Sequence, residues 1–150
     1  MFKETTWKDG EKKTQEYMKR VGYKIIYTNF SCVGVELDIV AILPKKIQVR
    51  LLKHEYKRKM TEDKARKHLY RYSLKSLLKT VDDLLVITEV KARETDKYGL
   101  GSDSVSDFKK QNIFRGARFL QKDPRFDKLQ FRFDVASFDG EKLTYIEGAF

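Results

Sequence analysis

Several short stretches of the chain carry apolar residues at the spacing of β-strands. In residues 33–43 every odd position is apolar, and residues 129–138 also alternate. Residues 23–30 and 84–93 are runs rich in β-branched and aromatic residues. Because side chains alternate across a strand and such residues favour strands, these stretches and the short stretch 143–146 predict a sheet.

Turn residues separate the predicted strands. Asn29, Ser31 and Gly34 follow the first stretch and predict its end. An Asp139-Gly140 pair predicts a tight turn before the last strand. Residues 94–103 are polar with two glycines, which favours a mobile loop.

Two further stretches show the spacing of helices. Residues 11–21 have apolar residues at helical intervals and end at Gly22, so Glu11 is expected in the first turn, where an acid complements the helix dipole. Residues 104–120 also predict a helix and place Lys109 inside it. The apolar residues expected on one face of this second helix are Val105, Phe108, Ile113, Ala117 and Leu120.

Residues 44–83 differ from the rest in charge. They hold thirteen Lys or Arg against five Asp or Glu, so eight of the ten net positive charges lie there. Ile47, Val49 and Leu51 alternate and favour a strand, and the leucine-rich part after a charged start at 61–63 favours a basic amphipathic helix. Such a helix either presents a solvated face or holds a phosphate backbone.

The order of elements is helix, strand, strand, basic insertion, strand, helix, strand, strand. It predicts one α/β domain, residues 1–150, with a mixed sheet flanked by helices and the insertion 44–83 between central strands. No internal repeat or low-complexity segment is present.

Composition narrows the class of protein. The net charge of +10 favours a polyanionic partner such as nucleic acid. Cys32 is the only cysteine, so an internal disulfide is excluded, and no apolar stretch has the length of a signal peptide or a membrane span. His54 and His68 lack metal-ligand spacing. A cytoplasmic protein that makes no membrane contact is the expectation.

Charged residues at strand and helix positions suggest one site. Glu89 and Lys91 lie at alternate positions and therefore share a face of their strand, and Asp38 stands among apolar neighbours on another strand. Glu11 is a third candidate acid. Mg²⁺ or Mn²⁺ prefers carboxylate oxygens and keeps waters that can be deprotonated for attack, while a lysine suits a phosphate. Two structural alternatives remain: Glu89 and Lys91 form a salt bridge at a strand end, and Asp38 is a surface aspartate.

The sequence resembles the YraN-like family of predicted bacterial endonucleases. The residues that carry the resemblance are Gly10-Glu11, Glu36-Leu-Asp38-Ile-Val-Ala41, Ile-Thr-Glu89-Val-Lys91-Ala-Arg93, Arg132-Phe-Asp134-Val and the ending Ala149-Phe150. That family is similar to archaeal Holliday-junction resolvases and belongs to the PD-(D/E)xK nuclease superfamily. The resemblance implies a restriction-endonuclease-like fold and covers nearly the whole chain except residues 44–83.

The resemblance also implies roles for individual residues. Asp38 and Glu89 match the metal-binding acids of the superfamily motif, Lys91 matches its lysine, and Glu11 matches the acid on the first helix near the metal. Lys109 falls where the family carries a basic residue, so it is a candidate contact to the phosphates of nucleic acid. Arg93 is a candidate phosphate contact, and so are three basic residues of the insertion. These are Lys57, Arg58 and Lys59.

The chain also departs from the family pattern. Val35 replaces a glycine, Ser31 replaces a basic residue, and Thr14 replaces a small alanine. The larger departure is the insertion, because the family joins the strands of Asp38 and Glu89 by a short hairpin. Strands remote in sequence can still pair, since the cost of closing a loop grows slowly with its length. The insertion extends a DNA-binding surface or blocks a resolvase-like dimer contact.

These observations leave three hypotheses. The first is a metal-dependent endonuclease that hydrolyses phosphodiester bonds in DNA, with branched or junction DNA suggested by analogy. The second is a non-catalytic nucleic-acid-binding protein of nuclease fold. The third is a basic scaffold for an acidic protein partner, which fails to bind nucleic acid at moderate salt. A homodimer is plausible, because resolvase relatives cut two strands symmetrically.

Overall fold

The computed structural model describes residues 7–60, 67–92, 94–95, 101–102 and 105–150. Side chains at 7, 59–60, 67–73, 94–95 and 101–102 are outside the description. The elements are α1 (Trp7–Val21), β1 (Lys24–Cys32), β2 (Val35–Leu43), α2 (Lys45–Met60), α3 (Lys67–Thr80), β3 (Leu84–Ala92), β4 (Glu94–Thr95), β5 (Gly101–Ser102), α4 (Asp107–Gln121), β6 (Gln130–Asp139) and β7 (Lys142–Ile146).

Five strands form one mixed sheet in the order β1-β2-β3-β6-β7. β3 and β6 are parallel, and the other neighbours are antiparallel. Parallel strands need a crossover connection, and here α4 lies within it. The predicted mixed α/β sheet is confirmed. β4 and β5 form a separate antiparallel pair within the segment for which a loop was predicted.

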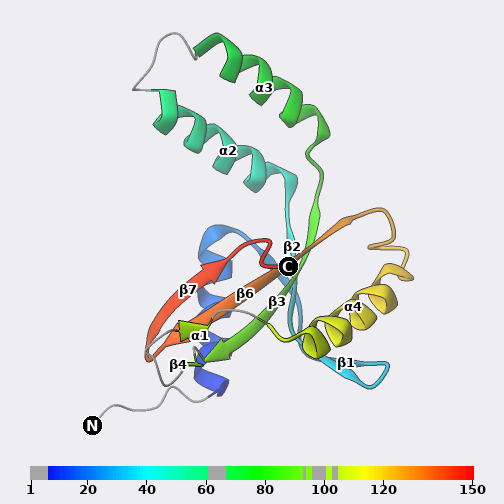
Figure 1. Ribbon diagram of the computed structural model, residues 1–150. Coiled ribbons are helices and arrows are strands. Elements are labelled where there is room, and N and C mark those ends of the chain that lie inside the picture. Colours follow the sequence, from blue (N-terminus) through cyan, green and yellow to red (C-terminus); the bar gives the residue numbers. More distant parts are fainter. Residues whose placement is uncertain (1–6, 61–66, 93, 96–100, 103–104) are drawn as a thin grey trace.

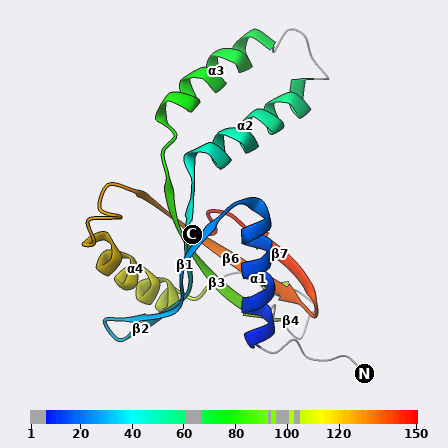
Figure 2. The same ribbon diagram turned by 180° about the vertical axis from the view of Figure 1, so that it is seen from behind.

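Helices α1 and α4 cover opposite faces of the sheet (Figure 1, Figure 2). On the α1 face, Met18 packs with Ile39, Val86 and Ala136, all fully buried. On the α4 face, a second cluster packs against the other sides of the same strands. Its buried members are Leu37, Val40, Leu85, Ile87, Val105, Ile113, Ala117, Leu120, Phe126 and Val135. Both faces of the central strands are therefore buried, which explains why β3 is an almost continuous apolar run.

The insertion is a pair of helices that projects from one end of the sheet (Figure 1). The strand predicted from Ile47, Val49 and Leu51 is wrong, because these residues lie in α2. Pro44 leads into the helix, and its carbonyl accepts hydrogen bonds from the N–H groups of Ile47 and Gln48. The long run of Lys, Arg, Leu and Gln favours a helix strongly enough to outweigh three alternating positions.

Hydrogen bonds close the base of this helical pair. The N–H group of Lys45, at the start of α2, donates to Asp83 Oδ1 at 2.7 Å. The side-chain amide of Gln48 donates to the carbonyls of Leu43 and Asp82 at 3.0 and 2.7 Å. The two ends of the insertion are thus held together where β2 ends and β3 begins.

Several predicted boundaries shift. β1 runs through Asn29 and Ser31 to Cys32, and the turn falls at Val33 and Gly34, both of which have positive φ. α1 begins at Trp7, so Glu11 lies beyond the first turn, in which Asp9 is the acid. The expectation that Glu11 complements the helix dipole from the first turn is therefore wrong, because Glu11 lies too far along the helix.

α4 is shorter at its beginning than predicted. The Ser106 side chain caps it by accepting a hydrogen bond from the N–H of Lys109 at 3.2 Å. Phe108 was expected on the buried face, but it is 78% exposed. It precedes Ile113 by five positions, so the two side chains leave different sides of the helix. None of the helices in the described ranges is long and apolar enough to cross a membrane.

The Arg132-Phe-Asp134-Val motif forms a buried network on the α1 face. The fully buried Asp134 carboxylate accepts two hydrogen bonds from Arg132, at 2.8 Å each, and one each from Tyr145 and the N–H of Gly148. Arg132 also donates to the Tyr23 hydroxyl at 2.6 Å. The network ties the end of the chain to β6, so this motif has a structural role on the sheet face opposite α4.

Candidate functional site

Strand register places Asp38 opposite Glu89. β2 and β3 pair from Leu43 with Leu84 to Ile39 with Thr88. The next step of this antiparallel register brings Asp38 to Glu89. The insertion leaves from the Leu43 end, so it replaces the hairpin turn and does not disturb the pairing. The two predicted acids are therefore neighbours despite their separation in sequence.

β2 departs from regular alternation at Asp38. Ile39 and Ala41 belong to the cluster on the α1 face, but Leu37 belongs to the cluster on the α4 face. The sequence predicted that all three share a face, and for Leu37 this is wrong. The ladder with β3 ends at Ile39, and beyond it Asp38 Oδ2 accepts the N–H of Val90 at 2.8 Å. Where β2 and β3 separate, the Asp38 carboxylate thus takes the place of a backbone carbonyl as the acceptor for the Val90 N–H.

Burial changes the protonation of the two acids. Asp38 is 2% exposed and Glu89 is 7% exposed. Burial and the negative charge of Glu89 raise the pKa of Asp38 to about 8, although the Val90 N–H favours the ionised form. Burial also raises the pKa of Glu89, and the positive charge of Lys109 opposes that rise. A side-chain hydrogen bond between the two carboxyl groups further raises the pKa of Asp38 and lowers that of Glu89.

Two lysines surround Glu89. Lys109 on α4 places its Nζ 3.2 Å from Glu89 Oε1. Lys91 follows Glu89 at the next position on the same face of β3, and its charge also lowers the pKa of Glu89. The sequence grouped Lys109 with phosphate contacts and gave no sign that it would pair with Glu89. Residues 20 positions apart meet only because α4 packs on this face of the sheet.

Glu11 reaches the sheet from α1. It is 5% exposed, and its Oε2 accepts a hydrogen bond from Asn29 Nδ2 at 3.1 Å. The register of β1 with β2 places Asn29 opposite Asp38, because Thr28 pairs with Ile39 and Phe30 pairs with Leu37. Sequence reasoning assigned Asn29 to a turn. Asn29 could have been recognised as a candidate site residue because its side-chain amide interrupts a stretch of aromatic and β-branched residues.

A divalent cation fits part of this arrangement. The buried Asp38 and Glu89 carboxyl groups repel each other when both are ionised, which a bound cation would relieve. The buried Oε1 of Glu11 has no hydrogen-bond partner among the described residues, so it offers an acceptor to a cation. However, no group of three or more His, Cys, Asp or Glu in the described ranges is arranged to hold a metal ion. Asp38 and Glu89 are thus the residues that would hold a cation, and a role for Glu11 as a third ligand stays a prediction.

The other predicted contacts lie apart or outside the description. Arg93 is not among the described residues. Lys57 and Arg58 lie exposed on α2, and the side chain of Lys59 is not described. The insertion leaves the sheet at Leu43, five positions along β2 from Asp38, or about 17 Å. The basic residues of α2 are therefore separate from the carboxyl pair.

Comparison of the sequence with known proteins identifies its family. The model of the uncharacterised protein family UPF0102 matches residues 61–138, which include Glu89, Lys91 and Lys109. The chain belongs to this family. A UPF0102 protein of Caldicellulosiruptor bescii is 31% identical over 149 residues, which are 94% of this chain and 92% of the relative.

Other UPF0102 proteins also align along most of their length. The protein of Clostridium acetobutylicum is 29% identical over 94% of this chain and 89% of its own. That of Caldanaerobacter subterraneus subsp. tengcongensis is 27% identical over 99% of this chain and 96% of its own. The YraN-like resemblance seen in the sequence is confirmed at the level of UPF0102. Membership of the nuclease superfamily stays a prediction.

Proposed function

We propose that this UPF0102 protein is a metal-dependent endonuclease of the PD-(D/E)xK superfamily that hydrolyses phosphodiester bonds in DNA, with branched or junction DNA as the substrate suggested by analogy. The observation that carries the proposal is the buried pair of Asp38 and Glu89, with the ammonium group of Lys109 3.2 Å from Glu89. Such a pair is costly to a fold, so it favours a functional site over a purely structural one.

Each residue has a distinct task in this proposal. Asp38 and Glu89 hold Mg²⁺ or Mn²⁺, which supplies Lewis-acid activation of the scissile phosphate. The Val90 N–H fixes the orientation of the Asp38 carboxylate. Lys91, which shares the face of Glu89, stabilises negative charge that develops on the phosphate. The positive charge of Lys109 opposes the rise in the pKa of Glu89 that burial causes.

The proposal is tested by metal-dependent cleavage. Wild type, Asp38→Ala and Glu89→Ala are incubated with linear, flapped and four-way-junction DNA, with Mg²⁺, Mn²⁺ or a chelator. We expect wild-type cleavage that needs metal and a loss of at least about 10³-fold in either variant, since both cation ligands are required. DNA affinity in chelator should stay within a few fold. The control is Asp127→Asn, a change at an exposed acid, which should cleave as wild type does. Equal cleavage by all four proteins would refute the assignment.

A second candidate is a nucleic-acid-binding protein of the same fold that does not cleave. It is favoured by the finding that the described residues include no metal-holding group of three or more ligand-type side chains. Binding of every DNA substrate without cleavage under any metal condition would support it. The carboxyl pair would then be a structural feature held by its proton and by Lys109.

A further inference from the structure

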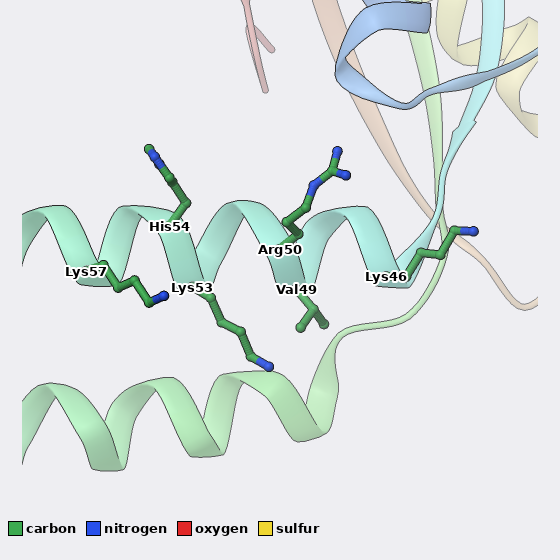
Figure 3. A pocket seen from close by; sticks show the side chains of 6 residues that line it. All are labelled: Lys46, Val49, Arg50, Lys53, His54 and Lys57. Atoms are coloured by element: carbon green, nitrogen blue, oxygen red, sulfur yellow. The ribbon is translucent and has the colours of Figure 1, made fainter.

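One surface of the insertion is strongly basic and hollow. Six residues of α2 line a hollow of about 480 Å³ (Figure 3). They are Lys46, Val49, Arg50, Lys53, His54 and Lys57. Figure 3 shows Arg50 and His54 on one flank of α2 and Lys53 and Lys57 on the flank toward α3 in that view. We call the four cationic residues and His54 the α2 basic row.

The basic row follows one side of the helix. Its positions recur at three- and four-residue intervals, which bring side chains onto one face. Lys46 and Lys57 lie about 16 Å apart along the axis. Glu55, the only acid of α2, falls about half a turn from Lys46 and so on the opposite side of the helix. The row thus forms a continuous positive surface that no acid of its own helix interrupts.

The row is also held in place. Ile47 on the same helix is 9% exposed and packs near Gly22, which follows α1. Arg50 donates to the carbonyl of Val21 at 3.4 Å. The base of the insertion is closed by the Lys45 to Asp83 hydrogen bond. These contacts fix the first half of α2 relative to the sheet that carries the carboxyl pair.

We propose that the α2 basic row binds the phosphate backbone of double-stranded DNA at a distance from the point of cleavage. This inference rests on the proposed function for the choice of DNA as the polyanion. The row spans the axial length of about five base pairs, since phosphates of one strand advance about 3.4 Å per base pair. A duplex held there extends past the end of the sheet, and the row adds affinity without taking part in the reaction.

The chemistry of the row favours a nucleic acid over a membrane. A membrane-surface helix needs large apolar residues beside its basic ones. Among the described residues that line the hollow, Val49 alone is apolar, and it is half-buried. The exposed Leu51 lies beside the row near His54, three positions further on, and about a third of a turn or more from Lys46, Lys53 and Lys57. A helix surface on which lysine and arginine outnumber apolar residues is typical of phosphate contacts.

The test removes three charges from the row. The variant Lys46→Gln, Lys53→Gln, Lys57→Gln changes exposed lysines only, so the fold should remain, as checked by thermal unfolding. Binding of a 24-base-pair duplex is measured in chelator, which prevents cleavage, over a range of salt concentrations. We expect affinity at 0.1 M salt to fall about 10- to 100-fold and the slope of log K against log salt to decrease by about 2 to 3.

The matched control removes three exposed lysines elsewhere: Lys19→Gln, Lys122→Gln, Lys142→Gln. For this control variant the slope of log K against log salt should change by less than about 1. Equal losses in both variants, or none in either, would overturn the row as a DNA site. Binding to vesicles of anionic lipid that exceeds binding to DNA and is lost in the row variant would also overturn it.

The outcome is separable from the proposed nuclease activity. Where wild type cleaves, the row variant should raise KM for the duplex, whereas the control variant Lys19→Gln, Lys122→Gln, Lys142→Gln should keep kcat and KM within about twofold. Where wild type binds but does not cleave, the row can still be established while the nuclease proposal fails. If wild type cleaves DNA and the row variant binds DNA as tightly as wild type does, the nuclease proposal stands and the row fails as a DNA site.

Discussion

Lys109 Nζ on α4 lies 3.2 Å from Glu89 Oε1 on β3. This ion pair joins the helix to the carboxyl pair, and the positive charge of Lys109 opposes the rise in the pKa of Glu89 that burial causes. Glu89 is buried, whereas the Lys109 side chain is 39% exposed. The lysine therefore offsets the charge of Glu89 and remains accessible to a phosphate group.

Replacing Lys109 by Met should destabilise the protein most at alkaline pH. Without the ammonium group the pKa of Glu89 rises further, so the folded state binds protons more tightly than the unfolded chain and loses stability as the pH increases. We expect a loss of about 1–2 kcal/mol at pH 8.5, reduced by the exposure of Lys109, and little loss at pH 5.5. Thermal unfolding in chelator at the two pH values measures it.

The control for that prediction is the neighbouring Lys110. Its Nζ lies 5.7 Å from the centre of the Phe150 ring. Lys110→Met should change stability by the same small amount at both pH values. A pH-independent effect of Lys109→Met would show that its charge does not act on Glu89.

Asp38→Asn should stabilise the metal-free protein at alkaline pH. The pKa of Asp38 is raised from its ordinary value to about 8, so wild type loses stability as the pH rises from about 4 through about 8. The asparagine carbonyl can still accept the Val90 N–H, and its amide can donate to Glu89. We expect the variant to exceed wild type by at least about 1 kcal/mol at pH 9 and by less at pH 5. Asp127→Asn, at an exposed acid, serves as control, and a constant difference would contradict the raised pKa.

Glu11→Gln should weaken cation binding while it preserves the fold. A glutamine carbonyl can still accept the hydrogen bond from Asn29, but the neutral amide is a poorer ligand for Mg²⁺ or Mn²⁺ than a carboxylate. We expect about a 10-fold loss of Mn²⁺ affinity by calorimetry without DNA, with an unfolding temperature close to wild type. Glu16→Gln, an exposed acid on the same helix, should bind Mn²⁺ as wild type does. An unchanged affinity in Glu11→Gln would remove Glu11 from the ligand set.

Gly116→Ala should destabilise the α4 face. A Cβ atom there would lie 2.9 Å from a methyl carbon of Leu37, which is fully buried beside Asp38 and has little room to move. We expect a loss of about 1–3 kcal/mol in denaturant unfolding. The contrast is Gly10→Ala on α1, where the nearest atom would be 3.4 Å away, at Val90. This change should be neutral or stabilising by up to about 1 kcal/mol.

The sequence alone determined the sheet and its candidate acids. Period-two alternation and continuous apolar runs identify strands because each strand buries its own side chains, and that pattern is local. It correctly isolated Asp38 as a carboxylate among buried neighbours and placed Glu89 and Lys91 on one face. It failed for α2, where three alternating residues in a helix-forming run had no partner strand to pair with.

Only the tertiary structure decided which of these residues meet. The ladder from Leu43 with Leu84 to Ile39 with Thr88 carries Asp38 to Glu89 across the insertion. The packing of α4 brings Lys109 to Glu89, and the packing of α1 brings Glu11 to Asn29. These contacts depend on strand register and helix placement, which arise from burial summed over the whole chain. No local pattern specifies them, and the same holds for the break in β2 that turns Leu37 toward α4.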